Sequence, residues 1–320
     1  MKLHLEPAAF ETLLLDTSER TGIRADIIEK DYYVSLLLKE LAEKQRDVPA
    51  YFKGGTALYK ALGSIRRFSE DIDLTVSVED CSNSQAKKRL ERATLEYSCL
   101  VRDKEDQDNE NRKGSITSVY KYNSVVDIDS EDALQRFGRV KVEATSFTVS
   151  EPFESMPIAP IIFNMATADQ KQILTDSYEA GPFMIATIKL ERIFVDKVFA
   201  AEFYFLRESY FDVAKHLYDL VVLLQNDKIK AMLEDEELLE KMIGFKRKEE
   251  QLRIGSELAD KPINQFSYLQ TGMDNVGLIK EFARMQEIYV FSDEHVITKD
   301  ELQKSIEELS GIFKYIEKQV

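Results

Sequence analysis

The chain has 320 residues, of which 44% are hydrophobic and 32% are charged, and its formal net charge is −15. Aliphatic and aromatic residues run through the whole length, which excludes a disordered chain, and the negative field disfavours a general binder of polyanions. A contact with nucleic acid would therefore need a local basic patch or a bound metal ion. At roughly 150 residues per domain, this length predicts two domains or one large one.

The sequence predicts neither a membrane span nor an export signal. It contains no run of 18 apolar residues, and its first residues include acids and form no long apolar core. Cys81 and Cys99 fit no metal-ligand spacing, and a reduced, cytoplasmic setting explains them more simply than a disulfide does. The histidines (His4, His216 and His295) are scattered, which leaves little for a zinc site or a Ser-His-Asp triad.

The first half of the chain predicts helices followed by a small sheet. The segment FSEDIDLTVSV alternates as a strand does, with Ile72, Leu74 and Val76 on one side. The other elements expected in chain order are helical residues 6–45, one or two helical turns over 56–62, a helix over 84–98, a solvated turn or mobile loop over 102–114, and strands over 115–122 and 139–147.

The second half predicts mainly helices. Residues 150–182 contain four prolines and predict a connector of irregular structure. From residue 184 onward we expect helices over 184–205, 210–225, 228–252, 277–290 and 300–319. The fold class is therefore α+β, with a small mixed sheet flanked by helices in a domain over residues 1–182 and a mainly helical domain over residues 183–320.

The strongest local signal is the segment KGGTALYKALGSIRRFSEDIDL, residues 53–74. Its glycines allow backbone N–H groups to approach a triphosphate closely, and the helix that follows them adds positive partial charge at its start. Asp71 and Asp73 point the same way on a strand, because side chains alternate. Two such carboxylates suit Mg²⁺, which takes oxygen ligands and usually adds substrate phosphates.

The D-x-D pattern alone is weak evidence, because it arises by chance in acidic proteins and recurs here at Asp127 and Asp129. Its combination with the double glycine, a short helix and a hydrophobic strand resembles the nucleotidyltransferase superfamily of the DNA-polymerase-β type. More narrowly, KGGTALYK and RRFSEDIDL resemble the first motif of the AbiEii family, the nucleotidyltransferase toxins that include the MenT toxins. IIEKDYYVSLLLKEL is similar to the helix that precedes this motif in that family.

The resemblance implies a third carboxylate on a neighbouring strand. Glu143, in RVKVEATSF, fits this place because it alternates with Val140 and Val142. The alternatives are that Glu143 is only an exposed strand residue, or that Asp127 or Asp129 takes the role.

The helical half contains two further segments that resemble the family. In LERIFVDKVFAAE, the resemblance implies that Lys197 contacts the nucleotide phosphates, and in AKHLYDLVVL that Asp219 is the final aspartate. A helix lysine ordinarily faces solvent, but Lys197 lies among apolar neighbours and an interior lysine needs a partner. Asp219 or the triphosphate would be that partner. Glu191 belongs to the same segment, and its role is open.

Five residues around the first motif are candidate nucleotide contacts: Gly54, Gly55, Thr56, Arg67 and Ser69. Ser69 matches a Ser-x-Asp unit of the family and would either bond a phosphate oxygen or help to cap the strand entrance. Arg67, with its neighbour Arg66, would meet a phosphate or an RNA backbone, or pair with the nearby Glu70.

The activity that the resemblance implies is transfer of a nucleoside monophosphate from a nucleoside triphosphate to RNA, with the 3′ end of tRNA as the expected acceptor. Asp71, Asp73 and Glu143 would hold Mg²⁺ or Mn²⁺, and Lys197 and Asp219 would complete the catalytic set. Asp71 or Glu143 would help to deprotonate the attacking hydroxyl. The expected partners are a nucleoside triphosphate, tRNA and a cognate antitoxin, and the expected location is the cytoplasm.

Three other interpretations remain open. The first is a transferase of the same fold that modifies a protein or a small molecule, for which a narrow closed pocket would be evidence. A basic groove formed by the runs IRRF, KRLER and FKRKEE would instead favour tRNA. The second is a non-catalytic nucleotide-binding module, and the third, most distant, is a D-x-D glycosyltransferase.

Overall fold

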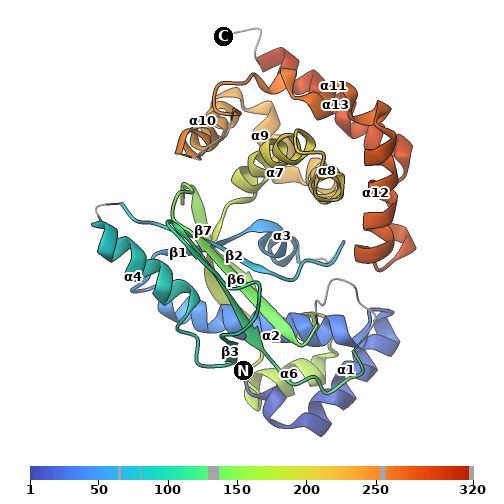
Figure 1. Ribbon diagram of the computed structural model, residues 1–320. Coiled ribbons are helices and arrows are strands. Elements are labelled where there is room, and N and C mark those ends of the chain that lie inside the picture. Colours follow the sequence, from blue (N-terminus) through green and yellow to red (C-terminus); the bar gives the residue numbers. More distant parts are fainter. Residues whose placement is uncertain (64–65, 80, 129–136, 253–256, 317–320) are drawn as a thin grey trace. The chain divides into compact units, whose positions relative to one another are not determined.

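The computed structural model describes the whole chain except residues 64–65, 80, 129–136, 253–256 and 317–320. The chain forms two compact units, Met1–Ile188 and Lys189–Val320. The first contains a mixed sheet with helices and the second is mainly helical, so the predicted α+β class is confirmed (Figure 1). Within the described residues, no helix is long and apolar enough to span a bilayer. Cys81 and Cys99 are free thiols.

The sheet of the first unit has the strand order β3-β5-β6-β2-β1-β8-β7, and β4 pairs with β5 beside β3. Neighbouring strands are parallel in two cases, β2 with β6 and β1 with β8, and all the other paired strands are antiparallel. The strands are β1 (Ala50–Lys53), β2 (Ile72–Val76), β3 (Val101–Asp103), β4 (Glu110–Arg112), β5 (Ser115–Lys121), β6 (Arg139–Thr145), β7 (Phe153–Ile158) and β8 (Phe183–Ile188).

One face of this sheet is apolar and covered by helices. Ile72, Leu74 and Val142 are fully buried on it. Tyr120 pairs with Val140 in register on the same face, and its hydroxyl donates to the carbonyl of Thr94 in α4 at 2.7 Å. The helices of this unit are α1 (Pro7–Thr21), α2 (Ala25–Lys44), α3 (Gly54–Leu62), α4 (Asn83–Thr94), α5 (Ile161–Asn164) and α6 (Ala168–Asp176).

Residues 150–182 are more regular than predicted, since they form β7, α5 and α6. The prolines do not prevent this, because Pro157 lies in a strand at the edge of the sheet, where a missing N–H is tolerated, and Pro160 is the N-cap residue of α5. Thr167 begins α6 with a capping box that includes Gln170. The expectation of an irregular connector was therefore wrong.

The predicted helix over 184–205 is also partly wrong, because its first residues form β8 and α7 (Leu190–Phe205) begins only afterwards. A short apolar run is ambiguous between strand and helix, and here pairing with β7 and β1 decides it. The predicted loop over 102–114 likewise contains the end of β3 and β4, which pair with β5 although they are polar.

The second unit is built around α7 and α8 (Tyr210–Leu224), which pack against each other. Val213, Leu217, Leu220 and Leu224 follow the helical repeat of α8 and are buried. The remaining helices are α9 (Asp227–Glu234), α10 (Glu236–Leu252), α11 (Ser267–Thr271), α12 (Val276–Tyr289) and α13 (Lys299–Ile316). The helix predicted near 277–290 is confirmed, and so is the one over 300–319 as far as residue 316, since residues 317–319 lie outside the described part of the chain. The one predicted over 228–252 is two helices.

Candidate active site

A row of polar residues crosses the second face of the sheet, opposite the helix-covered one. Lys53 of β1 pairs with Asp73 of β2, Asp73 pairs with Glu143 of β6, and Glu143 pairs with Thr117 of β5. Residues in register on neighbouring strands point to the same face. Asp73 and Glu143 are therefore neighbours, and both are half-buried.

Gly54 allows the first contact of α3 with this row. Its φ is +82°, and a Cβ atom added there would overlap with Oδ2 of Asp73. Only glycine fits both the backbone angle and the close approach. The carboxylate of Asp73 is consequently held against the start of α3, where the helix carries positive partial charge.

Gly55 and Thr56 attach the same helix start to the residues just before β2. A Cβ atom on Gly55 would lie 2.6 Å from Oγ of Ser69. The hydroxyl of Thr56 donates to the carbonyl oxygen of Asp71 at 2.6 Å and lies 3.1 Å from Oγ of Ser69. The GGT segment thus fixes the position of the aspartate strand by both side-chain and backbone contacts.

Asp71 contacts a cation that the sequence prediction missed. Its Oδ2 lies 2.9 Å from Nζ of Lys141, with side-chain exposures of 37% and 31%. Burial lowers the pKa of Lys141, but the nearby charges of Asp71, Glu143 and Asp73 outweigh it, so the pKa is raised above its ordinary value. Lys141 lies two residues before Glu143 in β6, so both side chains leave the same face of the sheet, and this spacing was the available signal.

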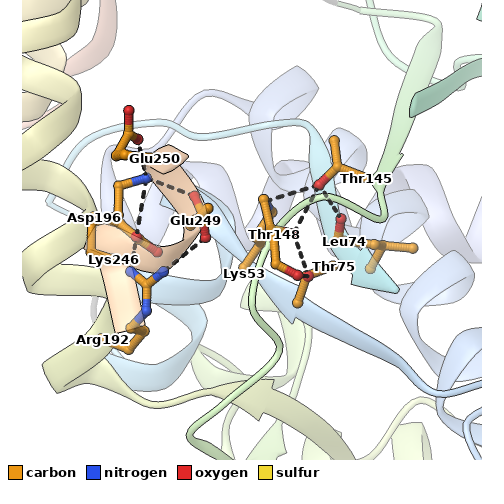
Figure 2. Close-up of polar contacts among 10 residues, drawn as sticks. All are labelled: Lys53, Leu74, Thr75, Thr145, Thr148, Arg192, Asp196, Lys246, Glu249 and Glu250. Carbon is orange, nitrogen blue, oxygen red and sulfur yellow. Dashed lines mark hydrogen bonds and ion pairs between the residues drawn. The ribbon is translucent and has the colours of Figure 1, made fainter. Parts of the chain in front are cut away.

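Next to the carboxylate row, a group of threonines joins β2 to β6 (Figure 2). Nζ of Lys53 donates to Oγ1 of Thr145 at 3.3 Å, and Thr145 lies 3.1 Å from the hydroxyl of Thr148. Thr148 also contacts the hydroxyl of Thr75, whose side chain donates to the Thr148 carbonyl at 3.1 Å. These contacts fix the register of the two strands that carry Asp73 and Glu143.

Arg67 lies behind this helix start and is 4% exposed. Its Nη1 donates to the carbonyl of Phe68 at 2.9 Å, and its guanidinium lies 5.5 Å from the centre of the Tyr59 ring. Together with Ser69, it lines a cavity of about 30 Å³. Glu70 bonds to Lys30 of α2 at 3.3 Å. The predicted nucleotide contact of Arg67 stays a prediction.

Of the two competitors for the third carboxylate, Asp127 does not join this row. Asp127 is exposed and lies outside the strands, and Asp129 falls outside the described residues. Glu143, in contrast, is directly paired with Asp73. Its position favours it over Asp127, although its role stays a prediction.

In the second unit, Lys197 and Asp219 form a buried ion pair. Nζ of Lys197 in α7 lies 2.7 Å from Oδ2 of Asp219 in α8, and the side chains are 7% and 0% exposed. The partner that the apolar surroundings of Lys197 required is therefore present. Whether the pair acts on a nucleotide stays a prediction.

A second buried group of charges joins α7 to α10 (Figure 2). Arg192 bonds to Asp196 and, at 2.8 Å, to Glu249, while Lys246 lies 2.6 Å from Glu249 and 2.8 Å from Glu250. Burial lowers the pKa of Arg192, and the acids oppose this effect. The sequence prediction missed this group, because its members are distant in sequence.

The basic runs are partly used for internal contacts. Within FKRKEE, Lys246 belongs to the buried group and Arg247 donates to the carbonyl of Ala259 at 2.6 Å. KRLER lies in α4, which packs on the apolar face of the sheet. KRLER therefore does not border the carboxylate row of the first unit.

The donors on the polar face suit a hard cation. Within the described residues, no three or more acids, histidines or cysteines form a preassembled metal cluster. Nonetheless, Asp73 is seated where a Cβ on residue 54 would block it, and Glu143 is its neighbour. Carboxylate oxygens are the ligands that Mg²⁺ takes, so these residues fit the ion.

A pair of carboxylates on a mixed sheet, seated against a glycine-rich helix start and followed by a helical unit, is the arrangement expected of a nucleotidyltransferase. A family model described as "Nucleotidyl transferase AbiEii toxin, Type IV TA system" matches residues 36–295. The chain therefore belongs to the AbiEii family of nucleotidyltransferase toxins, and the family predicted from the motifs is confirmed.

Among solved structures, the fold is similar to that of MenT4, a nucleotidyltransferase toxin from Mycobacterium tuberculosis H37Rv. The TM-score is 0.50 and the sequence identity 16%, and the match covers 93% of this chain and 98% of that one. At this identity the likeness shows the fold alone. No curated protein matches the chain.

Proposed function

We propose that this toxin is a metal-dependent nucleotidyltransferase that moves a nucleoside monophosphate from a nucleoside triphosphate to RNA, with the 3′ end of tRNA as acceptor. The observation that carries the proposal is the register of Asp73 with Glu143, beside Asp71, on a half-exposed polar face. If Asp73 and Ser69 served folding alone, they would not need to approach Gly54 and Gly55 so closely.

Asp71, Asp73 and Glu143 would hold Mg²⁺ or Mn²⁺. The bound ion would neutralise charge on the phosphates and align attack on the α-phosphate, with pyrophosphate as the leaving group. The backbone N–H groups at the start of α3 would bind phosphate oxygens, since the glycines leave no side chain in the way. Ser69, bonded to Thr56, would present its hydroxyl to the same phosphates.

Glu143 is the better candidate for the base that receives the proton of the attacking hydroxyl. Oδ2 of Asp71 lies 2.9 Å from the ammonium of Lys141, so this oxygen is already in contact with a donor and is less available to accept that proton. In the helical unit, Lys197 would stabilise phosphate charge, and Asp219 would orient its ammonium group.

RNA is favoured over a small molecule as the acceptor by the openness of the polar face. Asp71 and Lys141 are each about a third exposed, which suits the end of a large substrate.

The direct test is incubation of the purified protein with total tRNA, Mg²⁺ and each α-labelled nucleoside triphosphate in turn. We expect label in tRNA with the wild-type chain, and none with Asp71→Ala/Asp73→Ala. Asp103→Ala, which removes the carboxylate paired with Lys121 on other strands, is the matched control and retains transfer. Label on protein instead of tRNA would contradict the proposal that RNA is the acceptor. Nucleotide binding without transfer would contradict the proposal that the protein is a nucleotidyltransferase.

A further inference from the structure

Lys141 places a positive charge among the residues proposed to hold the metal ion. It lies two positions before Glu143 on β6, so both side chains leave the same face of the sheet. Its Nζ lies 2.9 Å from Oδ2 of Asp71. Since β2 and β6 run parallel in register, with Asp73 opposite Glu143, the charges of all three carboxylates act on this ammonium group.

Three carboxylates on one face repel one another unless a cation lies among them. The ammonium of a lysine is a compact point charge with three donors on a flexible stem, so it provides that cation within the chain itself. A divalent ion needs the same carboxylate oxygens that Lys141 contacts. The two cations therefore cannot both bind Asp71 fully.

We propose that Lys141 is a positioning residue that competes with the divalent cation for Asp71 and so weakens binding of the free ion. This inference rests on the proposed function, because it takes the three carboxylates to be the ion's ligands. Its consequence is that the ion binds well only when the phosphates of a nucleotide supply further oxygen ligands. Lys141 thereby makes productive cation binding depend on substrate.

The competition is measurable with Mn²⁺ alone, by electron paramagnetic resonance titration of the full chain. We expect Lys141→Met to bind Mn²⁺ roughly tenfold more tightly than wild type, which corresponds to about 1.4 kcal/mol. Lys141→Arg keeps the charge and should bind Mn²⁺ nearly as wild type does. Lys121→Met removes a lysine from the neighbouring strand β5, where it pairs with Asp103 at 2.6 Å, and should leave the affinity unchanged.

Asp71→Asn/Asp73→Asn separates the two possible failures. If this variant loses Mn²⁺ binding while Lys141→Met equals or falls below wild type, the competition is overturned and the metal site stands. If wild type and Asp71→Asn/Asp73→Asn bind Mn²⁺ alike, the carboxylates are not the ligands, and both proposals fall. A thermal melt of each variant confirms that the change is not one of folding, since the Lys141 side chain is 31% exposed.

Discussion

The two units carry their charges in opposite ways. On the sheet of the first unit, Asp71 and Lys141 are 37% and 31% exposed, whereas in the second unit Lys197 and Asp219 are 7% and 0% exposed. Half-exposed ion pairs contribute little to folding, but breaking a buried pair leaves an uncompensated charge. If a substitution of a charged residue on the sheet abolishes activity, the loss can therefore be assigned to chemistry. If a substitution of the buried pair between α7 and α8 abolishes activity, the loss can equally come from unfolding.

The largest loss of stability is expected for Asp219→Ala. This change strands the ammonium of Lys197 in the interior and should lower the free energy of unfolding by about 3–5 kcal/mol in urea titrations. Lys197→Met/Asp219→Leu, which removes both charges, should recover most of the loss. If Asp219→Ala lowers the free energy of unfolding by less than about 1 kcal/mol, the buried pair contributes no more than an exposed one, which contradicts the contrast between the two units.

The next largest effect is expected for Arg192→Met, which removes a cation bonded to Asp196 and Glu249. We expect a loss of about 2–4 kcal/mol, smaller than for Asp219→Ala because Lys246 still neutralises Glu249. The control is Arg284→Met, whose side chain is 60% exposed beside Glu281 and should cost less than about 0.5 kcal/mol. Equal losses in the two variants would show that burial does not set the cost.

Gly54→Ala tests the seat of Asp73. We expect about 2–3 kcal/mol of destabilisation from the positive φ and the overlap with the carboxylate, together with weaker Mn²⁺ binding. Gly63→Ala has a similar φ of +62°, but among the described residues no atom lies within 4 Å of a Cβ added there, so it should cost only about 1 kcal/mol. Unchanged Mn²⁺ affinity in Gly54→Ala would mean that the close contact between Gly54 and the carboxylate of Asp73 does not position a metal ligand.

The smallest effect on stability is expected for Glu143→Gln, which keeps the size of a half-buried side chain. The free energy of unfolding should change by less than about 0.5 kcal/mol, while nucleotide transfer falls by roughly 100-fold or more. Transfer at the wild-type rate would show that Glu143 is not the third carboxylate, and Asp127 or Asp129 would then be the candidate for that role.

The local motif was legible in the sequence because its parts are close in the chain and each has a separate physical reason. Glycines, a helix start and alternating aspartates follow one another in residues 53–74, and α3 and β2 assemble them directly. Lys141 was missed although it lies on the same face of its strand as Glu143, because a strand lysine ordinarily faces solvent. Only the register of β2 with β6 shows which carboxylates surround it.

Features that depend on distant pairing were not predictable. β8 has an apolar run that also suits a helix, and pairing with β1 and β7 decides between them. β7 tolerates Pro157 because it lies at the sheet edge, which no local pattern reveals. The buried group of Arg192 and Lys246 joins residues of α7 and α10 that are far apart in sequence.

The central claim is that the carboxylates of the polar sheet face act in chemistry and not in folding. The most direct measurement is transfer of labelled nucleotide to tRNA by Asp73→Asn, with the free energy of unfolding determined on the same preparation. The account predicts that transfer is lost while the free energy of unfolding stays within about 0.5 kcal/mol of wild type. Retained transfer, or a loss that merely parallels a loss of folded protein, would contradict it.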